Sequence, residues 1–199
     1  MNCAGLLPHL QDIRRDEKLL NSNVIHLLET SLSADVQTEN LGIEGYHAKF
    51  FNVGNGKGMV TYILEDKMWK CEKEEIHKTL QISKIKIQEI SSISLYRSSN
   101  HSIIEAAKSL KSFIKTGEAT LVTGDFNICT IKDPGNAVTK MLEGLGFKQL
   151  LSEATHIQGG HIDQCYWLDR KGKWKLPSVE RYSPYHSDHD ALLITLKKK

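Results

Sequence analysis

The chain has 199 residues, of which 40% are hydrophobic and 25% are charged, and this composition is that of an ordinary globular protein with a real core. Its formal net charge of +2 is too small to indicate nucleic-acid binding by itself. The four cysteines, Cys3, Cys71, Cys129 and Cys165, include no C-x-x-C pair, so they support neither a zinc ribbon nor a disulfide framework.

The amino end is not typical of a targeting signal. Residues 1–18 have no basic start and Pro8 interrupts their apolar run, so we expect no signal peptide. No stretch of the chain approaches the roughly 18 apolar residues of a membrane span. Together with reduced cysteines, these features predict a nuclear or cytoplasmic protein that is not secreted and has no membrane partner.

Helices and strands alternate along the whole chain. The spacing of apolar residues predicts, in order, a helix at 6–20, a strand at 23–30, a hairpin of 46–53 and 58–64, strands at 79–88 and 90–96, a helix at 102–115, a strand at 119–128, a helix at 136–146, and strands at 161–168 and 191–196. This order supports an α/β or α+β fold. No linker or internal repeat interrupts it, so we expect one domain over residues 1–199.

Polar or titratable groups recur at or near the ends of the predicted strands. They are Glu29, Tyr96, Asp125 with Asn127, Thr155, Asp163, and Asp188 with His189. Strand ends on a rigid sheet are common positions for active-site groups. If the strands align, these groups form an oxygen-rich cation site beside an acid/base group, and hard oxygen ligands suit Mg²⁺ or Mn²⁺.

Several short motifs occur in a characteristic order. They are "HLLET" (26–30), "GDFNI" (124–128), "THIQGGHID" (155–163) and "SDHDALLITL" (187–196). In this order they resemble the endonuclease/exonuclease/phosphatase superfamily, also called DNase I-like. "LYRSSN" (95–100) and the residues around "THIQGGHID" are most similar to the apurinic-like endonuclease domains of non-LTR retrotransposons and Helentron-type mobile elements.

The resemblance implies a metal site and its ligands. Asn2 and Glu29 match the amide and the carboxylate beside the metal, and Asp188 matches a further carboxylate there. The implied cofactor is Mg²⁺, with Mn²⁺ as a substitute.

The resemblance also implies catalytic roles. Asp125 matches the aspartate that orients or deprotonates the attacking water, and Asn127 matches the neighbour that hydrogen-bonds the phosphate. Tyr96 matches the tyrosine that contacts the scissile phosphate. His189 matches the histidine that faces the phosphate, and Asp163 matches the carboxylate that fixes this ring.

Further residues are expected to support the site or to bind the substrate. Thr155 and Ser187 match supporting hydroxyls. Arg97, Lys173 and Trp174 are candidates for contact with a nucleic-acid backbone or an unstacked base. The segment around Lys173 is more typical of a solvated turn than of a nucleic-acid contact.

The implied fold is a four-layer α/β sandwich, in which two packed, mostly antiparallel sheets are flanked by helices. Members of the family usually carry a full strand before the asparagine that Asn2 matches. We therefore expect a domain that was excised from a longer protein or truncated relative to one, such as a polyprotein with a reverse transcriptase or helicase.

The implied function is a Mg²⁺-dependent DNA endonuclease that leaves 3′-hydroxyl and 5′-phosphate ends. Two alternatives remain open at this point. One is a phosphodiesterase or phosphatase that acts on RNA, nucleotides or lipid phosphates, because one metal site serves many phosphates. The other is a catalytically inactive domain that binds nucleic acid.

Overall fold

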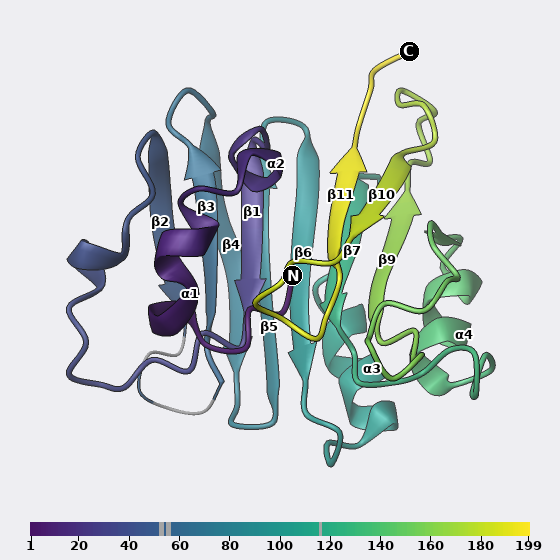
Figure 1. Cartoon of the computed structure of the whole chain (residues 1–199). Coiled ribbons are helices and arrows are strands. Elements are labelled where there is room, and N and C mark those ends of the chain that lie inside the picture. The colour runs from purple at the N-terminus through teal and green to yellow at the C-terminus, as the bar shows by residue number, and fades with distance from the viewer. Residues whose placement is uncertain (52–53, 55–56, 116) are drawn as a thin grey trace.

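The computed structural model describes residues 1–51, 54, 57–115 and 117–199, and its strands form two main sheets that face each other (Figure 1). The smaller main sheet has the order β1-β3-β2, with β1 at Val24–Leu28, β2 at Tyr46–Phe51 and β3 at Met59–Leu64. A separate two-stranded ribbon pairs β10 (Ser178–Tyr182) with β11 (Ala191–Thr195).

The larger sheet has six strands in the order β4-β5-β6-β7-β9-β8. Their bounds are Trp69–Ile76 (β4), Leu80–Ile87 (β5), Ile90–Arg97 (β6), Ala119–Asp125 (β7), Lys148–Gln149 (β8) and Asp163–Leu168 (β9). Only β6 and β7 pair in parallel, and α3 (Ile103–Lys111) forms the crossover between them. This crossover brings the carboxyl ends of β6 and β7 to the same edge of the sheet.

Helices cover the outer face of each main sheet. Helix α1 (Leu6–Ile13) packs its apolar face on the smaller sheet, where Leu6, Leu10 and Ile13 join one core cluster. Helix α3 and helix α4 (Ala137–Gly144) pack on the larger sheet through a second cluster that includes Leu110 and Leu142. The arrangement confirms the predicted α/β sandwich with flanking helices. Within the described residues, no helix is both long and apolar enough to cross a membrane.

The prediction of one helix over residues 6–20 was wrong. Helix α1 ends at Ile13, and a separate short helix, α2, covers Glu17–Leu20. The carboxylate of Asp16 accepts the backbone N–H groups of Lys18 and Leu19, so Asp16 is the N-cap of a new helix. A residue that caps a helix start has an extended backbone and cannot continue the preceding helix.

Strands β4 and β10, and the 3₁₀ turn η1 (Thr38–Leu41), were not predicted from the sequence. Strand β4 reads "WKCEKEEI", a charged pattern that suits the edge of a sheet because it discourages pairing with other chains. The predicted hairpin is present, since β2 and β3 pair in antiparallel fashion. Part of its connection, residues 52–53 and 55–56, lies outside the described residues.

A cavity of about 800 Å³ separates β1 from β11. Strand β1 pairs with β3 along one edge, whereas its other edge carries the parallel bridge between Asn2 and Leu28. The ammonium group of Met1 donates to the carbonyl of His26 at 2.9 Å, so the chain enters this space at its first residue. Apolar side chains of β11, including Leu192 and Ile194, line the opposite wall.

Candidate active site

Three of the predicted site residues are direct neighbours across the larger sheet. Tyr96, the residue before the end of β6, lies opposite Asp125 on β7. Asp125 in turn lies opposite Asp163, the first residue of β9. Gly124 precedes Asp125 with φ +150°, and a Cβ atom there would collide with the carbonyl oxygen of Leu95. The glycine of the "GDFN" motif therefore allows the close approach of β6 and β7 that aligns these side chains.

Asp125 is completely buried and accepts three hydrogen bonds. The backbone N–H of Asn127 donates to Oδ1 at 2.9 Å, while the side-chain amides of Asn127 and Asn2 donate to Oδ2 at 3.2 and 3.1 Å. Burial, and then the charge of Asp163, raise the pKa of Asp125 to about 7 in spite of these bonds. The carboxyl group is thus poised to exchange a proton near neutral pH.

Asn127 is held in the left-handed region of backbone space, with φ 48°. Its side-chain amide also donates to the carbonyl of Arg97 at 2.8 Å. In return, the guanidinium of Arg97 donates to the carbonyls of Phe126 at 2.6 Å and Asn127 at 2.7 Å. Arg97 is only 2% exposed, so the structure places it beneath the Asp125–Asn127 turn, where it supports the loop.

His189 contacts Asp163 directly and lies next to Asn2, which binds Asp125. Its Nδ1 lies 2.9 and 3.1 Å from the two carboxylate oxygens of Asp163. Its Nε2 lies 3.4 Å from the amide nitrogen of Asn2, which itself donates to Asp125. Burial lowers the pKa of His189, but the hydrogen bond to Asp163 and the charges of Asp163, Asp125 and Asp188 outweigh it and raise the pKa.

Two hydroxyls fix the loops that carry these groups. Thr155 Oγ1 accepts the backbone N–H groups of Ile162 at 3.2 Å and Asp163 at 3.0 Å, which holds the start of β9. Ser187 donates to the carbonyl of Asn2 at 2.9 Å and accepts the N–H of His189 at 3.1 Å. Ser187 thereby ties the amino end of the chain to the loop before β11.

Two acidic residues border this buried group on the solvent side. Glu29 follows β1 with φ 55°, and its carboxylate forms a 2.7 Å ion pair with Lys57. Burial, and then the charge and hydrogen bonding of Glu29, raise the pKa of Tyr96. The side chain of Asp188 is 55% exposed and lies 4.0 Å from Nε2 of His189 and 3.3 Å from Nε2 of His156.

The donor set fits a hard divalent cation. Two groups of side chains place their ligand atoms within 4.8 Å of one another: Asp125, Asp163 and His189, and His156, Asp188 and His189. The first group offers two carboxylates and one imidazole, and the second offers one carboxylate and two imidazoles. Carboxylate oxygens are the ligands that magnesium and manganese prefer. In Asn2, Oδ1 already accepts the N–H of Ala4 at 3.0 Å, so the amide oxygen points toward the chain's own backbone.

The structure does not bring Lys173 and Trp174 to this site. They follow Leu168, at the end of β9 remote from Asp163. Trp174 packs edge-to-face on Trp167 with ring centroids 6.5 Å apart, and Lys173 lies 4.0 Å from Glu89. Conversely, sequence reasoning missed Lys57 and the contact of His156 with Asp188, although "THIQGG" places His156 directly after Thr155.

Comparison with known proteins gives structural matches only: no family model matches the sequence, and no curated protein matches it either. An AP endonuclease from Archaeoglobus fulgidus has a TM-score of 0.72 at 15% identity, over 98% of this chain and 96% of that one. The endonuclease domain of TRAS1, a telomere-specific non-LTR retrotransposon, has a TM-score of 0.65 at 13% identity, over 95% and 91%.

A 3′–5′ exonuclease, NExo, from Neisseria meningitidis has a TM-score of 0.69 at 16% identity, over 99% of this chain and 97% of that one. These matches span nearly the whole chain, and they confirm the fold that the sequence motifs implied. The protein has the DNase I-like fold.

Proposed function

We propose that this protein is a Mg²⁺-dependent DNA endonuclease of the mobile-element type, which nicks a strand and leaves 3′-hydroxyl and 5′-phosphate ends. The observation that carries the proposal is a buried group in which Asp163 holds the ring of His189 and Asn2 donates to Asp125, with Asp188 beside His189 and Glu29 beside Tyr96. The likeness to a retrotransposon endonuclease domain and to an AP endonuclease supports DNA as the substrate.

Asp125 is the group proposed to orient and deprotonate the attacking water. A general base works best when its pKa lies near the working pH, and burial together with Asp163 raises the pKa of Asp125 to about 7. The amides of Asn2 and Asn127 hold the carboxylate in one orientation. Because its orientation is already fixed, the carboxylate loses little conformational entropy when it aligns a water molecule with the phosphorus atom.

His189 is proposed to donate from Nε2 to a non-bridging phosphate oxygen as negative charge develops there. Asp163 fixes the ring through Nδ1, and the surrounding carboxylates keep the imidazole protonated to a higher pH than usual. Tyr96 and Asn127 are proposed to contact the same phosphate. Tyr96 stays a neutral hydroxyl donor because its pKa is raised.

Glu29 and Asp188 are the proposed ligands of the metal, with Asn2 beside them. When bound, Mg²⁺ supplies Lewis-acid stabilisation of the phosphoryl oxygen and of the departing 3′-oxygen. Both carboxylates are accessible from solvent, Asp188 more so than Glu29, with side chains 55% and 16% exposed.

The same fold supports a second candidate, a phosphodiesterase or phosphatase that acts on other phosphates. NExo is described both as a 3′–5′ exonuclease and as a 3′ phosphatase bound to product DNA hairpin. A protein with these groups therefore has several phosphate substrates to be tested, including RNA and nucleotide phosphates.

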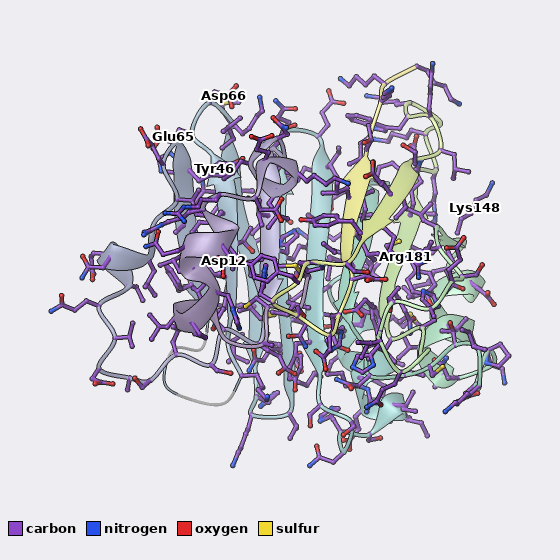
Figure 2. The ribbon with its side chains drawn as sticks, viewed as in Figure 1. Asp12, Tyr46, Glu65, Asp66, Lys148 and Arg181 are labelled. Carbon is purple, nitrogen blue, oxygen red and sulfur yellow. The ribbon has the colours of Figure 1, made fainter. Side chains whose placement is uncertain are left out.

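The test is nicking of supercoiled plasmid by the purified chain with Mg²⁺, with EDTA, and with the variant Asp188→Ala. We expect open-circular product from the wild type and none in the presence of EDTA or with Asp188→Ala. The matched control is Asp66→Ala, an exposed acid beyond β3 at the opposite end of the smaller sheet (Figure 2). It should nick like the wild type.

Parallel reactions with 5′-labelled RNA and a generic phosphodiester dye separate the candidates. Cleavage of RNA or dye without plasmid nicking would replace the DNA endonuclease with the second candidate. A folded wild-type chain that cleaves none of the three would favour a domain that binds nucleic acid without cleaving it.

A further inference from the structure

Two backbone hydrogen bonds join the loop that carries His156 to the loop that carries Asp188 and His189. The N–H of Ile157 donates to the carbonyl of Asp188 at 2.9 Å, and the N–H of Asp190 donates to the carbonyl of Thr155 at 2.7 Å. His156 and His189 are therefore paired as an isolated antiparallel bridge. This backbone pairing places the side chains of His156 and His189 next to each other.

The imidazole of His156 is held in one tautomer. The backbone N–H of Gln158 donates to Nδ1 at 3.1 Å, which assigns the lone pair to Nδ1 and the proton to Nε2. The protonated Nε2 lies 3.3 Å from Oδ2 of Asp188. The ring also packs edge-to-face on the ring of His189, with centroids 4.7 Å apart and an interplanar angle of 83°.

The two partners differ in how firmly the protein holds them. The side chain of His156 is 13% exposed, whereas that of Asp188 is 55% exposed. Among the described residues, the basic side chains nearest the Asp188 carboxylate are His156 and His189, whose Nε2 atoms lie 3.3 and 4.0 Å from it. The nearer of these two rings is His156, so it is the group best placed to set the position of the carboxylate.

The tautomer also argues against His156 as a metal ligand. A metal on Nε2 would require the lone pair there and the proton on Nδ1. That proton would then point at the N–H donor of Gln158, which leaves two donors facing each other. The arrangement therefore suits a histidine that positions the metal ligand Asp188 and does not bind the metal itself.

We propose that His156 is a positioning residue, which orients the carboxylate of Asp188 for a divalent cation by the contact of its Nε2 with Oδ2 of Asp188. Only the expected effect of His156 on nicking rests on the proposed endonuclease function. The orientation of Asp188 itself is tested by cation binding, so the two proposals fail separately.

The experiment is a titration of the full chain with Mn²⁺, followed by electron paramagnetic resonance of the free ion, for the wild type and three variants. His156→Ala removes the donor and the ring. His156→Phe keeps an aromatic ring against His189 but has no donor. His156→Gln supplies an N–H donor on a side chain of similar reach.

We expect the Mn²⁺ dissociation constant to rise about 10- to 100-fold in His156→Ala and His156→Phe, because groups that orient a ligand typically contribute this much to metal affinity. His156→Gln should restore most of the affinity. In the nicking assay, the first two variants should need correspondingly more Mg²⁺ and approach the wild-type rate at saturation. His47→Ala, an exposed histidine on β2, is the control and should behave as the wild type in both assays.

Three results would overturn the proposal. One is unchanged Mn²⁺ affinity in folded His156→Phe. Another is an equal loss in His156→Gln and His156→Ala, which would make His156 a direct ligand. The third is a wild-type chain that binds no Mn²⁺. If Mn²⁺ binding weakens as expected but the wild type cleaves no DNA, the role of His156 stands and the proposed endonuclease falls.

Discussion

The candidate site has a buried half and an exposed half, and the two are built on different principles. Asp125, Asp163 and His189 are at most 8% exposed, and each is hydrogen-bonded within the protein. Glu29 and Asp188 stand outside them: Glu29 forms an ion pair with Lys57, and Asp188 lies against Nε2 of His156. Folding thus fixes the groups that handle protons, whereas the groups that receive a cation from solvent are held more loosely.

The difference in burial between the two halves shows where activity is expected to cost stability. Burying a carboxyl group beside a second carboxylate favours its neutral form, which is why the pKa of Asp125 rises to about 7. The buried half should therefore show large effects of mutation on both rate and stability, and the exposed half should show effects on cation affinity.

The largest expected effect comes from the buried half. His189→Ala should lower the nicking rate by about 10³-fold or more, because a positioned acid/base group typically contributes two to four orders of magnitude. The circular dichroism spectrum should be unchanged, and His77→Ala, an exposed histidine at the end of β4, should retain full activity. Substantial cleavage by folded His189→Ala would remove His189 from the mechanism.

The second effect is on stability as a function of pH. Asp125 has a pKa of about 7 in the folded protein against an ordinary 3.8, so the unfolded chain loses its proton first as the pH rises. The contribution of Asp125 to the free energy of unfolding is therefore fully present below pH 4 and is lost as the pH rises through 7, at up to about 1.4 kcal/mol per pH unit.

Urea unfolding of the wild type and Asp125→Asn between pH 4 and 8 measures this slope. The asparagine also disturbs the hydrogen bonds from Asn2 and Asn127, but that loss lowers the free energy of unfolding by a similar amount at every pH. As the pH rises from 4 to 8, the free energy of unfolding should fall more for the wild type than for Asp125→Asn. Parallel stability curves would show that Asp125 is ionised throughout this range.

The smallest effect belongs to the exposed half. The ion pair of Lys57 with Glu29 competes with a cation for the same carboxylate, and the Lys57 side chain is 49% exposed. Such pairs contribute about 0–1 kcal/mol, so Lys57→Ala should lower the half-saturating Mg²⁺ concentration by no more than about fivefold. Lys67→Ala, which removes the Asp66 ion pair at the far end of the smaller sheet, is the control. A higher Mg²⁺ requirement in Lys57→Ala would mean that the lysine assists the site.

Sequence patterns predicted most of the core and the identity of the buried site residues. Alternating apolar residues identified β5 and β6, and short apolar runs identified β7 and β9. The polar groups at their ends meet because Tyr96, Asp125 and Asp163 share one register. The break between α1 and α2 was missed because the apolar spacing continues across it, while the capping role of Asp16 depends on its local geometry. Strand β4 was missed because its charged residues suit an edge strand and conceal the alternation.

Roles that depend on contacts between distant loops could not be predicted. Arg97 lies next to Tyr96 in the sequence and looks like a substrate-binding group, yet its donors are used by backbone carbonyls of the Asp125–Asn127 turn. Lys57 and His156 reach Glu29 and Asp188 only through the folded chain. Charge and motif spacing contain no signal for such pairs.

The position of Met1 has a practical consequence for handling the protein. Its amino group donates to His26 inside the cavity between β1 and β11, and burial lowers the pKa of this ammonium. An affinity tag or a protease remnant fused to Met1 must therefore pass between these two strands, two residues from Asn2. Lys199 is exposed and projects away from the sheets (Figure 1), so a tag at the carboxyl end leaves the amino end as the structure has it.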